Sequence, residues 1–333
     1  MKKVIIVTGG AGFIGSNLVE FLLENTDYSV VVLDSLTYAG DSRNLAGFWR
    51  NPRFVFIEGS INSQFLVQAL LEKYQPLGIM HLAAESHVDN SIMNADTFIS
   101  TNIVGTYRLL DASRKYITTH GIRNFRFLHV STDEVYGSLI MNSQRFNEDS
   151  KYQPNSPYSA SKASSDHLVR AYHETFGLNT VITNCSNNYG PKQHPEKLIP
   201  KTILNGLSWQ NIPLYGNGKN VRDWIYVKDH CRGLVEVFER GISGDTYCIG
   251  GNNEQTNRNI VTLICEELDN ITQMKEHANL IHHVPDRLGH DLRYAIDSSK
   301  IFRELSWEPE VSFRDGIRYT IDWYIENQKR YQK

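Results

Sequence analysis

A glycine-rich turn between a predicted strand and a predicted helix constrains the fold of this chain more than any other feature. Residues 4–7 form a short β-branched run, as expected of a buried parallel strand. The sequence TGGAGFIG follows, and apolar residues then recur at helical spacing over residues 16–23. Its glycines fit two overlapping spacings, GxGxxG beginning at Gly10 and GxxGxxG beginning at Gly9. Such a turn brings a pyrophosphate against a helix N-terminus and therefore predicts a dinucleotide-binding site.

A carboxylate after the second predicted strand indicates which dinucleotide binds. Residues 30–33 read as a strand that ends at Asp34, about 20 residues beyond the glycines. A carboxylate there would accept hydrogen bonds from the ribose hydroxyls of NAD and would repel the 2′-phosphate of NADP. The sequence therefore predicts NAD as the cofactor.

The alternation of strands and helices predicts the fold class. Strands are expected at residues 54–57 and 78–82, a helix at residues 64–73, and a long helical segment from about residue 96 to residue 116. Strands that alternate with helices form a parallel, doubly wound sheet. We therefore expect an α/β protein with a Rossmann-like sheet.

Composition excludes several other classes of protein. The chain has 333 residues, of which 41% are hydrophobic and 21% are charged, and its formal net charge is -3. This charge argues against a nucleic-acid surface, and no apolar run approaches the ~18 residues of a membrane span. We expect a cytoplasmic protein. The four cysteines show no paired spacing and the histidines show no zinc pattern, so we expect buried thiols and no metal site.

Two adjacent carboxylates at the end of a later strand point to a chemical role. Residues 125–130 read as a strand, and the sequence STDEVYG follows, with Asp133 beside Glu134. Ligands of a doubly wound sheet gather at the carboxyl ends of its strands. Because neighbouring like charges are costly where water is scarce, we expect this pair to face the cofactor and to take part in the chemistry.

A tyrosine and a lysine one helical turn apart supply a second chemical signal. Residues 156–177 read as a helix that begins near Pro157 and places Tyr158 and Lys162 on one face. A tyrosine has a reference pKa of about 10, and we expect the lysine and a nearby nicotinamide ring to lower this pKa. The tyrosine could then take a proton from a substrate hydroxyl while a hydride leaves for NAD.

Together these motifs resemble those of the extended short-chain dehydrogenase/reductases that act on nucleotide sugars, over nearly the whole chain. The adjacent carboxylates are similar to those of the branch that performs 4,6-dehydration. Relatives that only epimerise lack the pair, and relatives that act on GDP-mannose usually carry Ser in place of Asp133. The resemblance implies dTDP-glucose as the substrate. The alternatives are a 4,6-dehydratase of a UDP-, CDP- or GDP-hexose, a nucleotide-sugar 4-epimerase and a non-catalytic NAD-binding scaffold.

Dehydration would use both carboxylates. Oxidation at sugar carbon 4 acidifies the proton on carbon 5, and elimination then expels the hydroxyl on carbon 6. The resemblance implies that Glu134 is the base for the proton and Asp133 the acid for the departing hydroxyl, and like charge keeps one of two neighbouring carboxyls protonated. Hydride would then return from NADH to carbon 6 and give dTDP-4-keto-6-deoxyglucose. Thr132 is implied to bind the oxygen on carbon 4, beside Tyr158.

The resemblance also assigns binding residues position by position. The implied catalytic group is Thr132, Asp133, Glu134, Tyr158 and Lys162. The implied NAD contacts are Gly9, Gly12, Phe13, Ile14, Gly15, Asp34, Leu36, Thr37, Ser60, Ile61, Leu82, Ala83, Ala84, Ser86, Thr101, Tyr158 and Lys162. The implied sugar-nucleotide contacts are Ser86, Thr132, Asn187, Lys197, Leu198, Pro213, Tyr215, Arg222, Asn257, Arg287 and His290.

Five positions depart from the family's pattern. Ser60 replaces an Asp that usually contacts adenine, and Asn90 and Asn184 replace Arg. Leu288 and Leu292 replace Pro and Arg. Because none of the five belongs to the implied catalytic group, these departures bear on nucleotide preference rather than on the chemistry.

The resemblance further implies how the chain is organised. Residues 1–183 would form the NAD-binding domain with the catalytic residues, and residues 184–333 a smaller α/β lobe that mainly binds the sugar nucleotide and interleaves with the first. A last amphipathic helix is expected at residues 313–328. Family members commonly pair through the helices after Asp96 and around Tyr158, which implies a homodimer.

Overall fold

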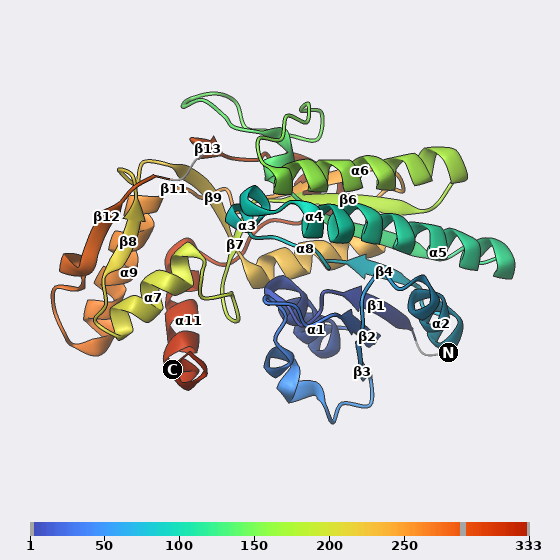
Figure 1. Ribbon diagram of the computed structural model, residues 1–333, viewed down its shortest axis with the longest axis horizontal. Coiled ribbons are helices and arrows are strands. Elements are labelled where there is room, and N and C mark those ends of the chain that lie inside the picture. The colour runs from blue at the N-terminus through green and yellow to red at the C-terminus, as the bar shows by residue number, and fades with distance from the viewer. Residues whose placement is uncertain (1–2, 287–290, 332–333) are drawn as a thin grey trace.

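A seven-stranded parallel sheet lies at the centre of the larger lobe of the computed structural model, which describes residues 3–286 and 291–331 (Figure 1). The strands lie in the order β10-β6-β5-β4-β1-β2-β3. β1 and β2 are rich in Val and Ile and buried along their whole length, because both faces of the sheet are covered. The strands are β1 (Val4–Thr8), β2 (Ser29–Asp34), β3 (Phe54–Glu58), β4 (Gly78–His81), β5 (Arg126–Thr132), β6 (Thr180–Cys185) and β10 (Thr246–Ile249).

Helices cover both faces of this sheet, which confirms the predicted doubly wound α/β fold (Figure 1). One face carries α1 (Phe13–Asn25), α8 (Val227–Arg240) and α10 (Ser299–Leu305), and the other carries α2 (Gln64–Tyr74), α5 (Thr106–His120) and α6 (Pro157–Phe176). Leu22 of α1 and Leu234 of α8 are buried in the same hydrophobic core. Leu71 of α2, Leu110 of α5 and Val169 of α6 share a second core.

A smaller lobe holds the other sheets (Figure 1, left). Its strands β7 (Asn187–Tyr189), β11 (Glu254–Thr256) and β13 (Arg293–Tyr294) pair with β9 (Val221–Tyr226), and β8 (Ile212–Tyr215) pairs with β12 (Ile281–Val284). The helices α7 (Leu198–Leu207), α9 (Asn257–Thr272) and α11 (Phe313–Glu326) complete it. Ile203, Ile264 and Ile321, one from each of these helices, are fully buried in a common core.

The two lobes interleave along the chain. β6 runs through the division expected at residue 183, and the later elements α8, β10 and α10 belong to the larger lobe. Trp307, which follows α10, is buried in that lobe's core, where it packs against Gly233 of α8. The chain therefore passes between the two lobes more than once. The division into residues 1–183 and 184–333 stays a prediction about which part binds NAD and which part binds the sugar nucleotide.

The helical segment expected from about residue 96 to residue 116 is present but irregular. α3 (Val88–Met93) precedes it, and the segment itself consists of α4 (Asp96–Phe98), a π-helical turn (Ile99–Gly105) and then α5. Π-helical turns are frequent at functional sites because they displace side chains from the regular helical positions.

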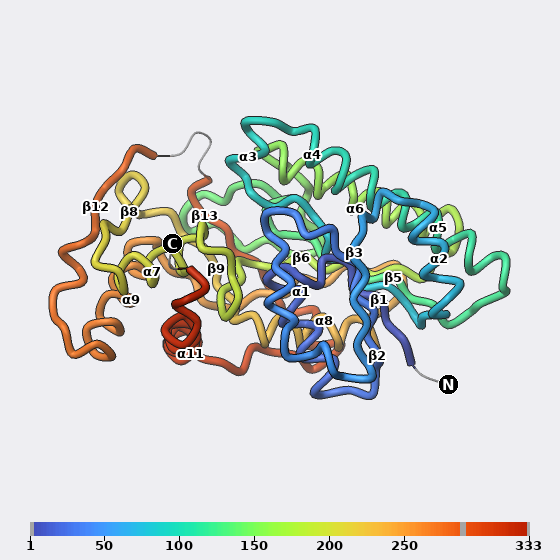
Figure 2. The backbone as a smooth tube through the Cα atoms, turned by 60° about the horizontal axis from the view of Figure 1, so that its bottom comes forward, coloured from blue at the N-terminus to red at the C-terminus, as the bar shows by residue number. Residues whose placement is uncertain are grey.

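Three further features can be compared with the sequence. All four cysteines are buried free thiols, as expected. α11 ends at Glu326, two residues before the expected end, because a 3₁₀ turn (Gln328–Arg330) follows it. In residues 3–286 and 291–331, no helix is both long enough and apolar enough to cross a membrane. Figure 2 shows the N-terminus beside the central sheet and the C-terminus beside the smaller lobe.

Candidate active site

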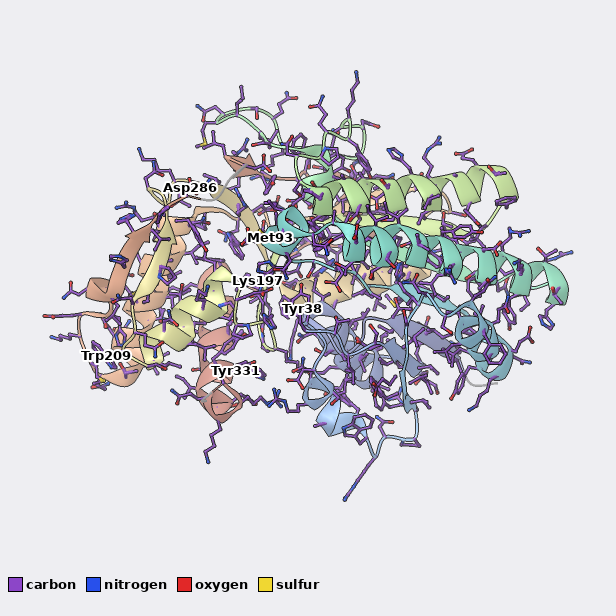
Figure 3. All side chains as sticks on the ribbon, in the orientation of Figure 1. Tyr38, Met93, Lys197, Trp209, Asp286 and Tyr331 are labelled. Atoms are coloured by element: carbon purple, nitrogen blue, oxygen red, sulfur yellow. The ribbon has the colours of Figure 1, made fainter. Side chains whose placement is uncertain are left out.

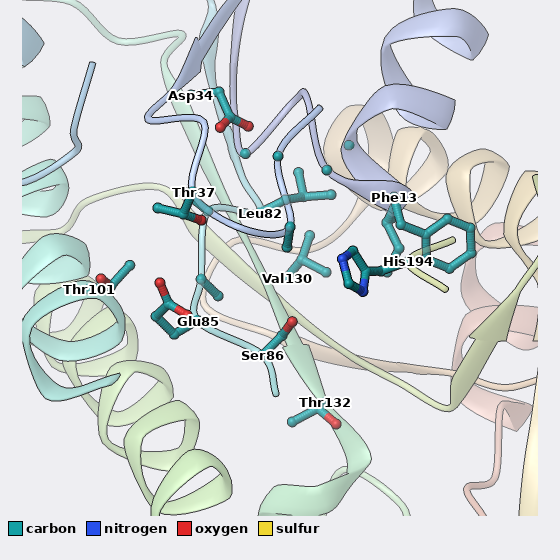
Figure 4. Close-up of a pocket in the computed structure, with 18 of the residues that line it drawn as sticks. Phe13, Asp34, Thr37, Leu82, Glu85, Ser86, Thr101, Val130, Thr132 and His194 are labelled. Atoms are coloured by element: carbon teal, nitrogen blue, oxygen red, sulfur yellow. The ribbon is translucent and has the colours of Figure 1, made fainter. Parts of the chain in front are cut away.

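A cavity of about 330 Å³ opens at the carboxyl ends of the parallel strands, where the sequence placed its motifs (Figure 4). Its volume is typical of small-ligand pockets. Residues at the ends of β1, β2, β3, β4 and β5 line it, together with residues 185–188, 193, 194, 196 and 197. Figure 3 shows Tyr38 of the larger lobe and Lys197 of the smaller one at the junction between them. The ring of Tyr38 meets the ring of His194 edge-on, with 5.8 Å between the centroids.

The glycine turn forms a cradle that side chains would fill. Gly9 has a φ of +71°, and a Cβ there would lie 2.6 Å from the backbone nitrogen of Ala83. A Cβ on Gly15 would overlap the carbonyl oxygen of Gly9. Gly12 precedes α1 without a side-chain cap, so the free N–H groups of the first turn face the cavity. This arrangement fits a pyrophosphate at the helix N-terminus. Gly10 does not line the cavity, so the spacing that begins at Gly9 describes the site.

Asp34 ends β2 and lines one end of the cavity. Its Oδ2 accepts a hydrogen bond from the backbone N–H of Ala11 at 2.9 Å, and its Oδ1 accepts one from Leu36 at 2.8 Å. Burial raises the pKa of Asp34, and the two hydrogen bonds oppose this rise. Figure 4 shows Asp34 and Thr37 at one end of the close-up and Thr132 at the other. The cavity is therefore long enough to separate a ribose site from a reaction site.

The predicted cofactor residues are gathered around this cavity. All of them line it except Leu36, whose backbone instead holds Asp34. Thr101 reaches the cavity from the π-helical turn. The neighbouring Asn102 is buried and holds the main chain of the cavity-lining Glu85 in place. It accepts a hydrogen bond from the N–H of Glu85 at 2.9 Å and donates one to the carbonyl oxygen of Glu85 at 3.0 Å.

The end of β5 carries the residues expected to react. Thr132 is the last residue of the strand, and its Oγ1 accepts a hydrogen bond from the N–H of Glu134 at 3.3 Å. A 3₁₀ turn (Asp133–Tyr136) begins there, and it sends the two neighbouring carboxylates in different directions. Glu134 lines the cavity, whereas Asp133 is 2% exposed and does not.

The environment of Asp133 favours its neutral form. Burial raises the pKa of Asp133 well above its usual range, and Glu134 and Asp223 raise it further, while Arg222 opposes them. Its Oδ2 is buried without a hydrogen-bond partner among the described residues. A carboxyl in such surroundings holds its proton at neutral pH. This agrees with the predicted division, in which Asp133 carries the proton.

Tyr158 and Lys162 both line the cavity from the first turns of α6. Ser156 caps this helix through a capping box with Ser159. Lys162 Nζ donates a hydrogen bond to the carbonyl oxygen of Val130 at 2.8 Å. Burial raises the pKa of Tyr158 well above its usual range, and the nearby carboxylates raise it further. The predicted lowering of this pKa depends on a bound nicotinamide ring as well as on Lys162, so it stays a prediction.

The predicted sugar-nucleotide residues fall into two groups. One group lines the cavity: Ser86, Thr132, Asn187 and Lys197. The other lies in the smaller lobe at the start of α7, in β8, in β9 and at the start of α9, and does not line the cavity: Leu198, Pro213, Tyr215, Arg222 and Asn257. Arg287 and His290 lie outside the described residues.

Arg222 is occupied by contacts within the smaller lobe. Its Nη1 donates a hydrogen bond to the carbonyl oxygen of Val221 at 2.8 Å, and its Nη2 donates one to that of Asp291 at 2.9 Å. The guanidinium lies 4.3 Å from the ring centroid of Tyr294. Arg222 is thereby held beside Asp133, on whose pKa it acts.

Several cavity residues were missed by sequence reasoning. Of the sequence QHPEK, residues 193–197, only Lys197 was predicted as a binding residue. Glu196 forms an ion pair with His194, with 3.4 Å between the atoms, and another with His87 of the larger lobe at 3.2 Å. The cluster of charges in QHPEK was a usable signal, but the partner His87 is more than 100 positions away. The other cavity residues that were not predicted are Leu33, Ser35, Ala39, Gly40, Gly59, Glu85, Val130, Ser131, Cys185, Ser186, Asn188 and Gln193.

The family departures are dispersed over the structure. Ser60 lines the cavity, and its Oγ accepts a hydrogen bond from the N–H of Asn62 at 3.2 Å. Asn90 and Leu292 are exposed, and Leu288 lies outside the described residues. Asn184 is buried behind the reacting residues, as described below.

These features define an NAD-linked α/β enzyme site with a proton-transfer pair and two neighbouring carboxyl groups. In residues 3–286 and 291–331, no group of three or more His, Cys, Asp or Glu could hold a metal ion. A family model described as GDP-mannose 4,6 dehydratase matches residues 6–320. The chain belongs to this family, which is part of the extended short-chain dehydrogenase/reductases.

Individual relatives and solved structures are similar to this chain over nearly its whole length. The chain is 49% identical over 339 residues to a dTDP-glucose 4,6-dehydratase of Neisseria gonorrhoeae, with 99% of this chain and 98% of the relative covered. It is 51% identical over 337 residues to dTDP-glucose 4,6-dehydratase 1 of Escherichia coli K12, with 98% and 93% covered. The crystal structure of the dTDP-glucose 4,6-dehydratase DesIV of Streptomyces venezuelae, which has NAD bound, matches with a TM-score of 0.90 and 47% identity over 98% of each chain.

Proposed function

We propose that this chain is an NAD-dependent nucleotide-sugar 4,6-dehydratase that converts dTDP-glucose to dTDP-4-keto-6-deoxyglucose. The observation that carries this proposal is the division of the carboxyl pair, in which Asp133 is buried with a raised pKa and its neighbour Glu134 lines the cavity. The names of the relatives at about half identity support dTDP-glucose as the substrate. NAD fits the glycine cradle and the carboxylate of Asp34.

The first step is oxidation of the sugar at carbon 4. NAD, when bound, supplies a site that takes a hydride from carbon 4 and returns it to carbon 6. With NAD bound, its positively charged ring and the charge of Lys162, which donates a hydrogen bond to the carbonyl of Val130, would favour the phenolate of Tyr158. This phenolate takes the proton of the carbon 4 hydroxyl, and Thr132, whose hydroxyl lowers the pKa of Tyr158 through a hydrogen bond, orients the carbon 4 hydroxyl.

The second step is elimination of water across carbons 5 and 6. Glu134 removes the proton from carbon 5, which the new ketone has made acidic, and Asp133 gives its proton to the departing hydroxyl once its side chain has turned from its buried position toward the substrate. Their roles follow from environment, because the raised pKa of Asp133 keeps a proton available on it, whereas Glu134 lines the cavity that would hold carbon 5. The C–H electron pair forms the double bond as the C–O bond breaks, and the products of this step are an enone and water. Return of the hydride to carbon 6 and of the proton on Glu134 to carbon 5 would then give dTDP-4-keto-6-deoxyglucose.

The alternatives are less well supported. A 4-epimerase has no need of an acid–base pair for elimination. A non-catalytic scaffold has no need of the polar contacts that hold Thr132 and Glu134 in place. We also propose that the protein is cytoplasmic and that it forms a homodimer through α5 and α6. In support of the dimer, the exposed side chains on these two helices include Tyr107 and Phe176.

The proposal is tested by mass spectrometry of dTDP-glucose incubated with the purified protein and NAD, without added reductant. We expect loss of one water with no net change in NAD. UDP-, CDP- and GDP-hexoses run in parallel rank the nucleotides. An isomer of unchanged mass would indicate epimerase activity, and an unchanged substrate with all four nucleotides would contradict the proposal.

The base assignment is tested with Glu134→Gln. Loss of a general base reduces turnover by about 100-fold or more, so dehydration should fall by this amount while oxidation by Tyr158 persists as enzyme-bound reduced cofactor. The exposed Glu24→Gln is the matched control and should keep the wild-type rate. Product formation by Glu134→Gln at near the wild-type rate would show that Glu134 is not the base.

A further inference from the structure

Asp166 is a buried carboxylate behind the cavity that the proposed mechanism does not use. It lies on α6, is 2% exposed and does not line the cavity. Its Oδ2 accepts hydrogen bonds from Ser131 Oγ at 2.8 Å, from the Tyr152 hydroxyl at 2.9 Å and from Asn184 Nδ2 at 3.3 Å. All three donors are neutral. A carboxylate buried this deeply is costly unless a nearby positive charge also stabilises it.

Lys162 supplies that positive charge. The two residues are four positions apart in α6, so their side chains leave the helix on the same side. Lys162 is 5% exposed, and Nζ donates a hydrogen bond to Val130 of β5. Burial lowers the pKa of Lys162, and Asp166 is foremost among the groups that oppose this lowering.

The other titratable groups around Lys162 are neutral. His129 Nε2 lies 3.1 Å from Asp166 Oδ1 without the geometry of a hydrogen bond, and burial lowers the pKa of His129 to about 4. Burial also lowers the pKa of His81 and raises that of Cys185 to about 12. Tyr158, on the same helix, is neutral as well. Asp166 is therefore the charged group that compensates Lys162 from behind the cavity.

The same carboxylate braces the strand that carries the reacting residues. Its partner Ser131 precedes Thr132 in β5. Its partner Asn184 also donates a hydrogen bond to the carbonyl oxygen of Thr132, at 3.1 Å, from the neighbouring strand β6. Asp166 thus joins α6, β5 and β6 at the point where β5 enters the turn with the two carboxyl groups.

We infer that Asp166 is a positioning residue that keeps Lys162 charged and fixes the carboxyl end of β5. Its effect on catalysis rests on the proposed function, in which Lys162 must be positive to favour the phenolate of Tyr158. Its effect on Lys162 itself does not, and it can be measured without the reaction.

The test compares Asp166→Asn with the wild-type protein. The titration of Lys162 is followed by NMR in the protein labelled with ¹³C at lysine, and the signal is assigned by its loss in Lys162→Met. An opposite charge nearby shifts a pKa by about 1–3 units, so the titration midpoint of Lys162 should fall by about one pH unit or more in Asp166→Asn. The alkaline limb of the pH–kcat profile for dTDP-glucose should move in the same direction.

Two further variants separate charge from packing. Tyr152→Phe removes one hydrogen bond to Asp166 but keeps the carboxylate, so it should lower stability and leave the Lys162 midpoint in place. Asp166→Glu keeps the charge and should also leave the midpoint in place while kcat falls. An unmoved midpoint in Asp166→Asn would overturn the inference, as would an equal fall in Asp166→Glu. Should the Asn variant not fold, Asp166→Ser, which also removes the charge but is smaller, takes its place, and an unmoved Lys162 midpoint in it would equally overturn the inference. A wild-type protein inactive on dTDP-glucose would refute the proposed function and leave the NMR result standing.

Discussion

Replacement of Gly9 by alanine should both destabilise the protein and weaken NAD binding. The residue is constrained twice. Its φ of +71° lies in the left-handed region, and its hydrogen faces the end of β4, where a Cβ would lie 2.6 Å from the nitrogen and 2.8 Å from the Cα of Ala83. These neighbours are backbone atoms, so no side chain can rotate to make room.

The cost has two parts that the structure separates. A left-handed φ costs an alanine about 1–2 kcal/mol. The Cβ must also move to ordinary contact distance, and such overpacking costs about 1–3 kcal/mol. We therefore expect the free energy of unfolding to fall by about 2–5 kcal/mol. The displaced segment includes Leu82 and Ala83, which line the cavity, so the Kd for NAD should rise by about tenfold or more, which corresponds to about 1.4 kcal/mol.

Two other glycines provide the controls. Gly121 has a φ of +61° with open space around its Cβ position, and Gly47 has open space without a left-handed φ. In urea unfolding, Gly121→Ala should show only the conformational cost, and Gly47→Ala should be nearly neutral. NAD affinity, measured by calorimetry, should be unchanged in both. If Gly9→Ala cost no more than Gly121→Ala and bound NAD normally, the argument from close backbone approach would be refuted.

Two further predictions concern pH. The folded state raises the pKa of Asp133. The burial of Asp133 therefore lowers the stability of the protein progressively as the pH rises from the unfolded pKa of about 3.9. Asp133→Asn should be inactive, yet more stable than the wild type by about 1 kcal/mol or more at pH 7. Urea unfolding at pH 4 and pH 7 checks this, and a gain that does not grow with pH would contradict it. Glu254 shows the opposite case: hydrogen bonds from Arg293, at 2.6 and 3.1 Å, lower its pKa, and Arg145 contributes to the lowering. The stabilisation of the folded state by these contacts is present above the unfolded pKa of Glu254, about 4.3, and is lost as the pH falls through the pKa of Glu254 in the folded state. Glu254→Gln should therefore cost about 1–2 kcal/mol at pH 7 and less in acid, and a pH-independent loss would contradict the argument.

The parts of the site that follow from local chain geometry could be predicted from the sequence. Gly9 and Asp34 lie within a few residues of the strand ends that position them, so their spacing carries the information. Tyr158 and Lys162 share a helical face for the same reason. In each case the structural constraint and the sequence signal span fewer than about 30 residues, which is the length of a βαβ unit.

Contacts between distant segments could not be predicted in the same way. Glu196 meets His87 only because the lobes pack together, and nothing in the spacing of either residue indicates its partner. The rise in the pKa of Tyr158 in the chain without a cofactor could not be predicted either, because it depends on how much burial the completed fold imposes on the hydroxyl. The hydrogen bonds from Arg222 to the carbonyl oxygens of Val221 and Asp291 could not be predicted either, and its expected role at the substrate stays a prediction.

The division of labour within the carboxyl pair depends on both lobes. Glu134 reaches the cavity because β5 of the larger lobe ends at Thr132 and the chain turns there. The pKa of Asp133 is set in addition by Arg222 and Asp223, which act on it from β9 of the smaller lobe with opposite signs. In the proposed mechanism, the base is thus positioned by one lobe, whereas the proton affinity of the acid is adjusted by the other. It follows that a change in the position of β9 would alter the proposed acid while leaving the proposed base and the glycine cradle in place, so such a change should slow elimination more than the preceding oxidation.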